Sequence, residues 1–177
     1  FDTFGNSVAN VIFSEKSDFL EIRSDLLIKR YAQSASDPHS DSSFGRMPLN
    51  YSAENLIDLA PFIPMQYPDE RDALRNWLDQ FFQSRPLEVT TFLAALSAVI
   101  HATCAYSRRE ERGTQSAMTT LNKGTGTCRD FAFLFMECVR VFGFAARFVT
   151  GYLHVKDDPD DTGFRGGGST HAWADVY

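Results

Sequence analysis

The pattern of hydrophobic and polar positions is strand-like at the start of the chain, helical in the middle and strand-like again at the end. Apolar residues follow a Gly5-Asn6 turn signal at Val8 and Val11–Phe13, and a second strand-like stretch runs from Phe19 to Tyr31. So few strands cannot bury both faces of a sheet. We therefore expect residues 1–33 to be the remnant of a larger β-rich domain, or an edge addition to the next domain.

Residues 34–50 are rich in Ser, Asp, Pro and Gly and show no apolar periodicity. This composition is typical of a linker. It separates the first strands from residues 51–177, which we expect to form the main domain.

Apolar residues recur at three- and four-residue steps from Ser52 onward, which predicts helices that pack against a common core. A short helix opens at Ser52 and ends near Pro61. A second helix is expected over Asp69–Phe82, and a third begins at Pro86 and continues through His101. We expect His101 to have a structural or solvent-exposed role.

A further helical stripe begins at Cys128. The glycines Gly124 and Gly126 precede it, apolar side chains recur as far as about Phe142, and Gly143 is well suited to end the helix. The sixteen Phe residues of the chain favour a core built largely on aromatic packing.

Strand-like sequence returns after this helix. One strand is expected over Ala145–Val155 and a last one starting near His171, with a polar, glycine-rich segment at 157–168 that we expect to be mobile. Helices followed by strands predict an α+β fold in which helices pack on an antiparallel sheet.

The charge of the chain bears on its possible partners, and its apolar runs and first residue bear on its location and origin. The formal net charge is −6 and the sequence has no long basic block, which argues against nucleic acid or an anionic membrane as a partner. No apolar run is long enough to span a membrane and no signal peptide is present, so a cytoplasmic location is favoured while the true localisation stays open. The chain begins with Phe1 rather than Met, and we expect it to be an excised or processed piece of a longer protein.

The three cysteines, Cys104, Cys128 and Cys138, show no CxxC spacing. Cys104 and Cys138 lie within apolar helical patterns and are expected to be small buried hydrophobes. No disulfide framework is expected. No metal-ligand spacing is present either, so we expect no metal or other cofactor.

Cys128 and His171 are candidates for a nucleophilic site. The unpaired N–H groups and the positive end of the dipole at a helix N-terminus favour a thiolate over a thiol. Packing the helix against the strands would bring His171 to this sulfur, which gives the two principal parts of a Cys-His site. The structural alternative for Cys128 is a small residue tucked under a tight turn.

Several sequence runs around these residues match known motifs in a fixed order. In order, they are Thr119-Thr120-Leu121, Gly126-Thr127-Cys128-Arg129-Asp130-Phe131-Ala132, Arg140 through Gly143 to Tyr152, and His171-Ala172-Trp173-Ala174-Asp175-Val176-Tyr177. Together they resemble the transglutaminase-like superfamily in its bacterial form, over roughly residues 85–177. Upstream of these runs, Tyr106 resembles the aromatic residue that commonly precedes the first loop of this superfamily.

The resemblance implies a papain-like fold and a Cys-His-Asp triad with Cys128 as nucleophile and His171 as base. The superfamily includes enzymes that cross-link or deamidate glutamine, proteases and amidases, and members that have lost catalysis, so a protein or peptide substrate is implied. The triad Asp of the family lies on the strand after the histidine strand, and this chain ends at Tyr177 before reaching it. We therefore expect the triad Asp to lie beyond the chain, which is incomplete at its C-terminal side.

Two other acidic residues are not expected to replace the triad Asp. Asp175 lies about 13 Å along the strand from His171, at about 3.3 Å per residue, and is expected to face solvent or pair locally. Asp130 is expected to support the first turn of the helix that begins at Cys128.

The leading hypothesis is a cysteine-dependent acyl-transfer enzyme: a peptidase or amidase, or a glutamine-directed transglutaminase or deamidase. The sequence does not separate these activities. The alternatives are a non-catalytic transglutaminase-like interaction or scaffold module, and a structural α+β domain. Without its triad Asp the 177-residue chain is expected to be poorly active, and its exposed sheet edge is expected to favour self-association.

Overall fold

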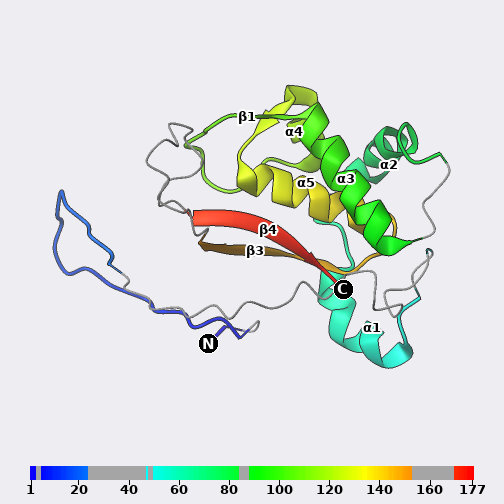
Figure 1. Ribbon diagram of the computed structural model, residues 1–177. Coiled ribbons are helices and arrows are strands. Elements are labelled where there is room, and N and C mark those ends of the chain that lie inside the picture. The colour runs from blue at the N-terminus through cyan, green and yellow to red at the C-terminus, as the bar shows by residue number, and fades with distance from the viewer. Residues whose placement is uncertain (3–4, 24–46, 48–49, 84–87, 153–169) are drawn as a thin grey trace, which may run out of the picture. The chain divides into compact units, whose positions relative to one another are not determined.

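The computed structural model describes residues 1–2, 5–23, 47, 50–83, 88–152 and 170–177 (Figure 1). The chain divides into two units, Phe1–Ala35 and Ser36–Tyr177. Most of the predicted linker 34–50, the end of the strand predicted over Ala145–Val155 and the predicted mobile segment 157–168 lie outside the described residues.

The first unit differs from the sequence-based expectation. No strand forms within residues 5–23, so the predicted strand around Val8 and the described part of the predicted strand Phe19–Tyr31 are wrong. A strand needs a neighbouring backbone to receive its hydrogen bonds and a layer to cover its apolar face. Within the described residues of this unit no strand pairing is found, and the side chains of Ile12 and Ile22 are 93% and 85% exposed.

The second unit contains all the helices and strands found in the described residues. In chain order they are α1 (Ala53–Leu59), the 3₁₀ turns η1 (Ala60–Phe62) and η2 (Pro68–Glu70), α2 (Arg71–Asp79), α3 (Val89–Thr103), β1 (Ala105–Tyr106), α4 (Ala117–Lys123), β2 (Thr125–Gly126), α5 (Cys128–Val141), β3 (Ala146–Tyr152) and β4 (Thr170–Val176). None of these helices is both long and apolar enough to cross a membrane.

The elements form layers around α5. Strands β3 and β4 pair antiparallel, from Ala146 opposite Val176 to Tyr152 opposite Thr170, while β1 and β2 form a parallel pair of two residues each. Helix α5 lies against the β3–β4 sheet, and α2, α3 and α4 pack on α5 from its other side (Figure 1). The predicted α+β fold with helices on an antiparallel sheet is confirmed.

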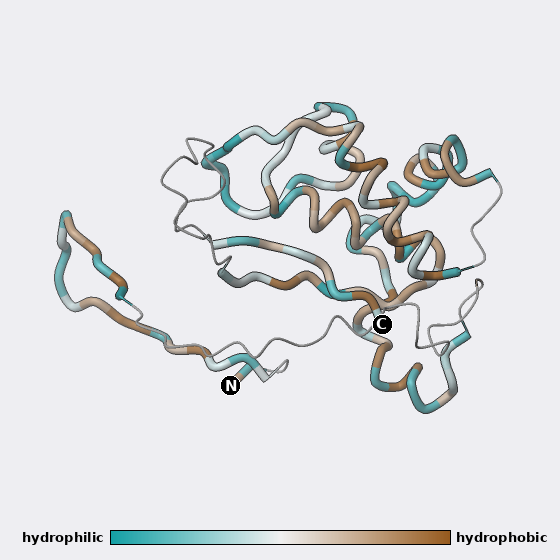
Figure 2. The backbone as a smooth tube through the Cα atoms, viewed as in Figure 1, coloured by the Kyte–Doolittle hydropathy of each residue, from teal (hydrophilic) through white to brown (hydrophobic). Residues whose placement is uncertain are grey.

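The core of the second unit lies between these layers. Its largest fully buried apolar side chains are Leu74, Leu78, Phe92, Leu96, Leu134, Val139 and Phe144. Phe92 is at the centre of an aromatic cluster, with ring centroids 5.2 Å from Phe82, 5.0 Å from Phe142 and 6.0 Å from Phe144. Hydrophobic colours gather accordingly on α3 and α5 (Figure 2). The core thus contains an aromatic cluster, but most of its buried side chains are aliphatic, so the largely aromatic core that the phenylalanine content favoured is not what forms.

Helix α5 ends as its sequence predicts. Gly143 has a φ of 86°, a left-handed conformation that suits glycine, and its N–H donates to the carbonyl of Arg140 at 3.0 Å. The N–H of Phe144 donates to the carbonyl of Val139 at 3.2 Å. These two bonds form a Schellman motif, which turns the chain from α5 toward β3.

A buried ion pair, which the sequence pattern did not reveal, fixes the C-terminal half of α5 to its surroundings. Arg140 and Glu137 are 3.1 Å apart, and their side chains are only 8% and 1% exposed. The Glu137 carboxylate accepts hydrogen bonds from the N–H groups of Gln66 and Tyr67, and Arg140 donates to the carbonyls of Phe62 and Ala146. Residues 62–67 and the start of β3 are thus held on one helix.

Candidate active site

Cys128 is the first residue of α5, as predicted, and its side chain is half-buried. Backbone bonds hold the segment before it, because the N–H groups of Ala105 and Ser107 donate to the carbonyls of Gly124 and Gly126, both at 2.8 Å. Position 126 requires glycine because there is no room for a side chain. A Cβ at this position would lie 2.9 Å from the Cβ of Asp130.

The carboxylate of Asp130 organises the first turn of α5. It accepts hydrogen bonds from the backbone N–H and the hydroxyl of Thr127 and from the N–H of Gln115, all at 2.8 Å, and it pairs with Arg109. Burial alone would raise the pKa of Asp130, but the bond from Arg109 and those from Gln115 and Thr127 hold that pKa well below its usual range. The predicted support for the first turn is confirmed, and it comes from direct hydrogen bonds.

Arg109 and Gln115 are parts of this site that the sequence reasoning missed. The Arg109 guanidinium also donates to the carbonyls of Glu111 at 3.1 Å and Gly113 at 2.7 Å, so it fixes the turn of its own loop. Hydrogen bonds to Asp130 raise the pKa of Arg109 further. An arginine in a charged loop gives no periodic signal in the sequence. The only hint was Asp130, because a carboxylate at the buried start of a helix needs a cationic or hydrogen-bonding partner.

His171 lies on β4 directly opposite Gly151 on β3. Because side chains alternate along a strand, His171, Trp173 and Asp175 share one face of the sheet. Ala172 and Ala174 point toward the opposite face, where Ala172 is buried and Ala174 packs against the helical core. Asp175 pairs with Arg147 at 2.9 Å, which confirms that it pairs locally.

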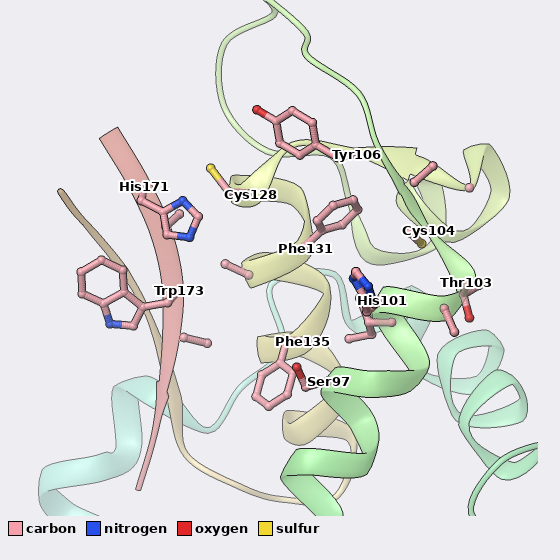
Figure 3. Close-up of a pocket in the computed structure, with 17 residues that line it drawn as sticks. Ser97, His101, Thr103, Cys104, Tyr106, Cys128, Phe131, Phe135, His171 and Trp173 are labelled. Carbon is pink, nitrogen blue, oxygen red and sulfur yellow. The ribbon is translucent and has the colours of Figure 1, made fainter. Parts of the chain in front are cut away.

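Cys128 and His171 line the same pocket, which has a volume of about 810 Å³ (Figure 3). The rest of the lining comes mainly from the end of α3, from β1, from the exposed edge of α5 and from β4. Cys128, His171 and Tyr106 lie at one end, and Ser97 and Phe135 lie farther along (Figure 3). The structure therefore brings the two predicted site residues to one cavity.

The other candidate residues take the places expected of them. His101 is solvent-exposed on the last turn of α3, where it forms part of the pocket wall away from the Cys128 end. Cys104 and Cys138 are buried, at 7% and 0% exposure, and burial raises the pKa of both thiols. Within the described ranges, no three His, Cys, Asp or Glu side chains come together to hold a metal ion.

Comparison with known families matches the half of the chain that contains this site. The model of the transglutaminase-like superfamily matches residues 78–177. The chain belongs to the transglutaminase-like superfamily. The resemblance of its sequence motifs is thereby confirmed, and the pocket lies within the matched residues.

Relatives in this superfamily include mycobacterial proteins. Uncharacterized protein Rv2569c of Mycobacterium tuberculosis and Uncharacterized protein Mb2599c of Mycobacterium bovis are each 31% identical over 140 residues, which cover 74% of this chain and 40% of theirs. Uncharacterized protein ML0607 of Mycobacterium leprae is 37% identical over 62 residues, or 35% of this chain and 22% of its own. The chain thus spans less than half the length of these relatives.

One solved structure has the same fold. The crystal structure of a "putative cysteine protease" from Cytophaga hutchinsonii superposes with a TM-score of 0.56 at 23% identity, covering 76% of this chain and 42% of that one. This likeness confirms the papain-like, transglutaminase-like architecture of the fold.

Proposed function

We propose that this transglutaminase-like core carries out cysteine-dependent acyl transfer, with Cys128 as the nucleophile and His171 as the general base. One observation carries the proposal: a half-buried thiol at a helix start and a histidine on the packed sheet line one open pocket. The buried thiols Cys104 and Cys138 are poorer candidates, because burial raises their pKa values and disfavours the thiolate.

In the proposed reaction the Cys128 thiolate attacks the carbonyl carbon of a protein or peptide amide. His171, protonated by the thiol, gives that proton to the leaving amine as the carbon–nitrogen bond breaks, and a thioester remains. Water or a second amine then attacks the thioester while His171 takes its proton. The products are a carboxylic acid or a new amide, and the thiolate and the imidazolium are restored.

Negative charge develops on the substrate oxygen during both attacks. The first N–H groups of an α-helix have no partner within the helix, and they point toward its N-terminal end. We propose that the N–H of Cys128 donates to this oxygen, since it lies beside the attacking sulfur. Asp130 and the β1–β2 pair would keep this N–H in place.

The third member of the triad is proposed to be an Asp outside the chain. Of the two acidic residues nearest the pair in sequence, Asp130 is occupied by Arg109, Gln115 and Thr127, and Asp175 by Arg147. Each would have to give up these bonds to orient His171. The choice among peptidase, amidase, deamidase and transglutaminase depends on which acyl acceptor reaches the thioester.

The test compares Cys128→Ala with Cys138→Ala in the full-length protein, using amide hydrolysis and amine incorporation on one panel of peptides. We expect Cys128→Ala and His171→Ala each to lower turnover by about 10³-fold or more, as loss of a nucleophile or base does in other triads. Cys138→Ala removes a thiol from the same helix and should retain turnover, since Cys138 is buried in the core.

Labelling with iodoacetamide gives a second measurement that needs no substrate. Cys128 should be modified before Cys104 and Cys138 in the folded protein, and all three should react once it is unfolded. No turnover on any peptide, together with equal labelling of the three thiols, would favour the non-catalytic interaction module instead.

A further inference from the structure

Gly151 leaves room for the side chain of Trp173. A Cβ built on Gly151 would lie 2.5 Å from Cη2, 3.0 Å from Cζ3 and 3.7 Å from Cζ2 of the indole. The six-membered ring of Trp173 therefore covers Gly151. The backbone of Gly151 does not have a positive φ, so glycine is required at this position for space and not for its conformation.

The covered glycine stands directly opposite His171 in the β3–β4 ladder. Side chains at opposite positions of two antiparallel strands are neighbours, with Cβ atoms about 5 Å apart. The indole thus fills the place beside the imidazole where a side chain of β3 would otherwise stand. Figure 3 shows the indole on the β3 side of β4 and the imidazole on the side of Cys128.

We propose that Trp173 and Gly151 are positioning residues that hold the imidazole of His171 toward Cys128. A histidine χ1 has three staggered positions, and a ring lying over Gly151 excludes the one directed toward β3. This positioning role rests on the proposed function, because Trp173 and Gly151 contribute to catalysis only if His171 acts on Cys128. Trp173 is 41% exposed, so it shields one side of the imidazole and leaves the pocket side open.

A double-mutant cycle in the full-length protein tests the coupling between the two residues. Gly151→Ala should displace the indole and lower kcat by about 3- to 100-fold with little change in KM. The lower end corresponds to a loss of rotamer restriction at His171, and the upper end to a misplacement of the imidazole by about 1 Å. Trp173→Ala should have a similar effect. The double variant should be no worse than Trp173→Ala, since no indole remains for the new methyl group to displace. Losses that multiply in the double variant would overturn the proposal.

The chemical shift of the His171 Cε1 proton gives a readout that does not depend on turnover. An aromatic ring beside the imidazole shifts this resonance, so Trp173→Ala and Gly151→Ala should both move it. Tyr152→Ala is the matched control, because Tyr152 is exposed, adjacent to Gly151 and directed to the other face of the sheet. Thermal unfolding followed by circular dichroism should show that all variants remain folded.

The two measurements separate the two proposals. An unchanged His171 resonance in both variants would overturn the positioning role, whatever the activity. A shifted resonance in a protein whose wild type turns over no peptide would support the packing but reject the proposed function, and with it the task assigned to the packing.

Discussion

At the scale of single residues, Asp130 joins three backbone segments next to Cys128. Its carboxylate holds the loop that contains Arg109, the backbone at Gln115 and the residue that precedes Cys128. The side chain is fully buried, and each bond to it is charge-assisted. The place of the half-buried thiol is therefore set by a carboxylate two residues away that is itself inaccessible.

Asp130 should make the stability of the domain depend on pH. Its pKa is lower in the folded state than the value of about 3.9 in an unfolded chain, so its contribution is fully present above that value and is lost as the pH falls. The free energy of unfolding should therefore decrease from about pH 5 downward. Asp130→Asn should remove this part of the pH dependence and lower stability at pH 7 by about 2–4 kcal/mol, because Arg109 loses its partner.

Urea unfolding of both proteins between pH 3 and pH 7 measures this difference. Asp175→Asn serves as the control, since it removes an exposed carboxylate that also pairs with an arginine. Parallel pH profiles for wild type and Asp130→Asn would show that the native bonds of Asp130 do not lower its pKa.

At the scale of elements, α5 is the piece to which the others attach. Its N-terminus carries Cys128, the helix contacts both β3 and β4, and its last turns hold residues 62–67 through Glu137 and Arg140. Two ion pairs on these elements differ mainly in burial. Glu137 and Arg140 are 1% and 8% exposed, whereas Asp175 and Arg147 are 37% and 47% exposed.

We expect the two pairs to differ strongly in their effect on stability. Glu137→Gln leaves Arg140 buried without a counter-charge and should cost about 3–5 kcal/mol. Asp175→Asn should cost far less, because water and salt screen an exposed pair. Chemical denaturation of the two variants at pH 7 gives the comparison, and equal losses would mean that burial does not decide the worth of these pairs.

The elements that the sequence predicted are those with long periodic patterns. The helix from Cys128 and the strands containing Gly151 and His171 could be predicted because their apolar residues repeat over about two turns or more, or over several alternations. Helix α4 was missed, since seven residues with polar Thr and Asn side chains give little periodicity. The β1–β2 pair was also missed, because two residues on each side give no signal and their pairing is not local.

The sequence singled out Cys128 and His171, which line one pocket, but it did not reveal the residues that support them. Cys128 and His171 stand out because reactive residue types occur in recognisable motifs. Arg109 lies 21 positions from Asp130 and Trp173 lies 22 from Gly151, and no local rule connects such pairs. No strand forms at Val8–Phe13 or in residues 19–23 of the strand predicted over Phe19–Tyr31, because strand propensity depends on its structural context and apolar residues alone do not produce a strand.

At the scale of the whole molecule, the buried hydrophobic core lies in the second unit. Its members run from Met65 to Ala146, and the large apolar side chains described in the first unit are exposed. The conformational entropy of folding must be offset by such burial, so the second unit contains its own source of stability.

We expect residues 36–177 to fold without residues 1–35. Removal of the first unit should change the thermal midpoint by less than about 4 °C, which corresponds to about 1 kcal/mol for a domain of this size. Calorimetry and far-ultraviolet circular dichroism of the two proteins, each measured at two concentrations, provide the test. A cooperative transition lost on removal of residues 1–35 would show that the second unit depends on the first.

The order of the pocket-lining segments along the chain also has a consequence for synthesis on the ribosome. Cys128 and His171 are separated by 42 intervening positions and come to line one pocket only through the docking of β4 on α5. At about 5–20 residues per second, the thiol is polymerised roughly 2–9 s before the imidazole. During that interval the nascent chain contains Cys128 but does not yet contain His171. The proposed Cys128–His171 pair can therefore form only after β4 has been synthesised and has packed on α5. The proposed chemistry cannot begin before that point.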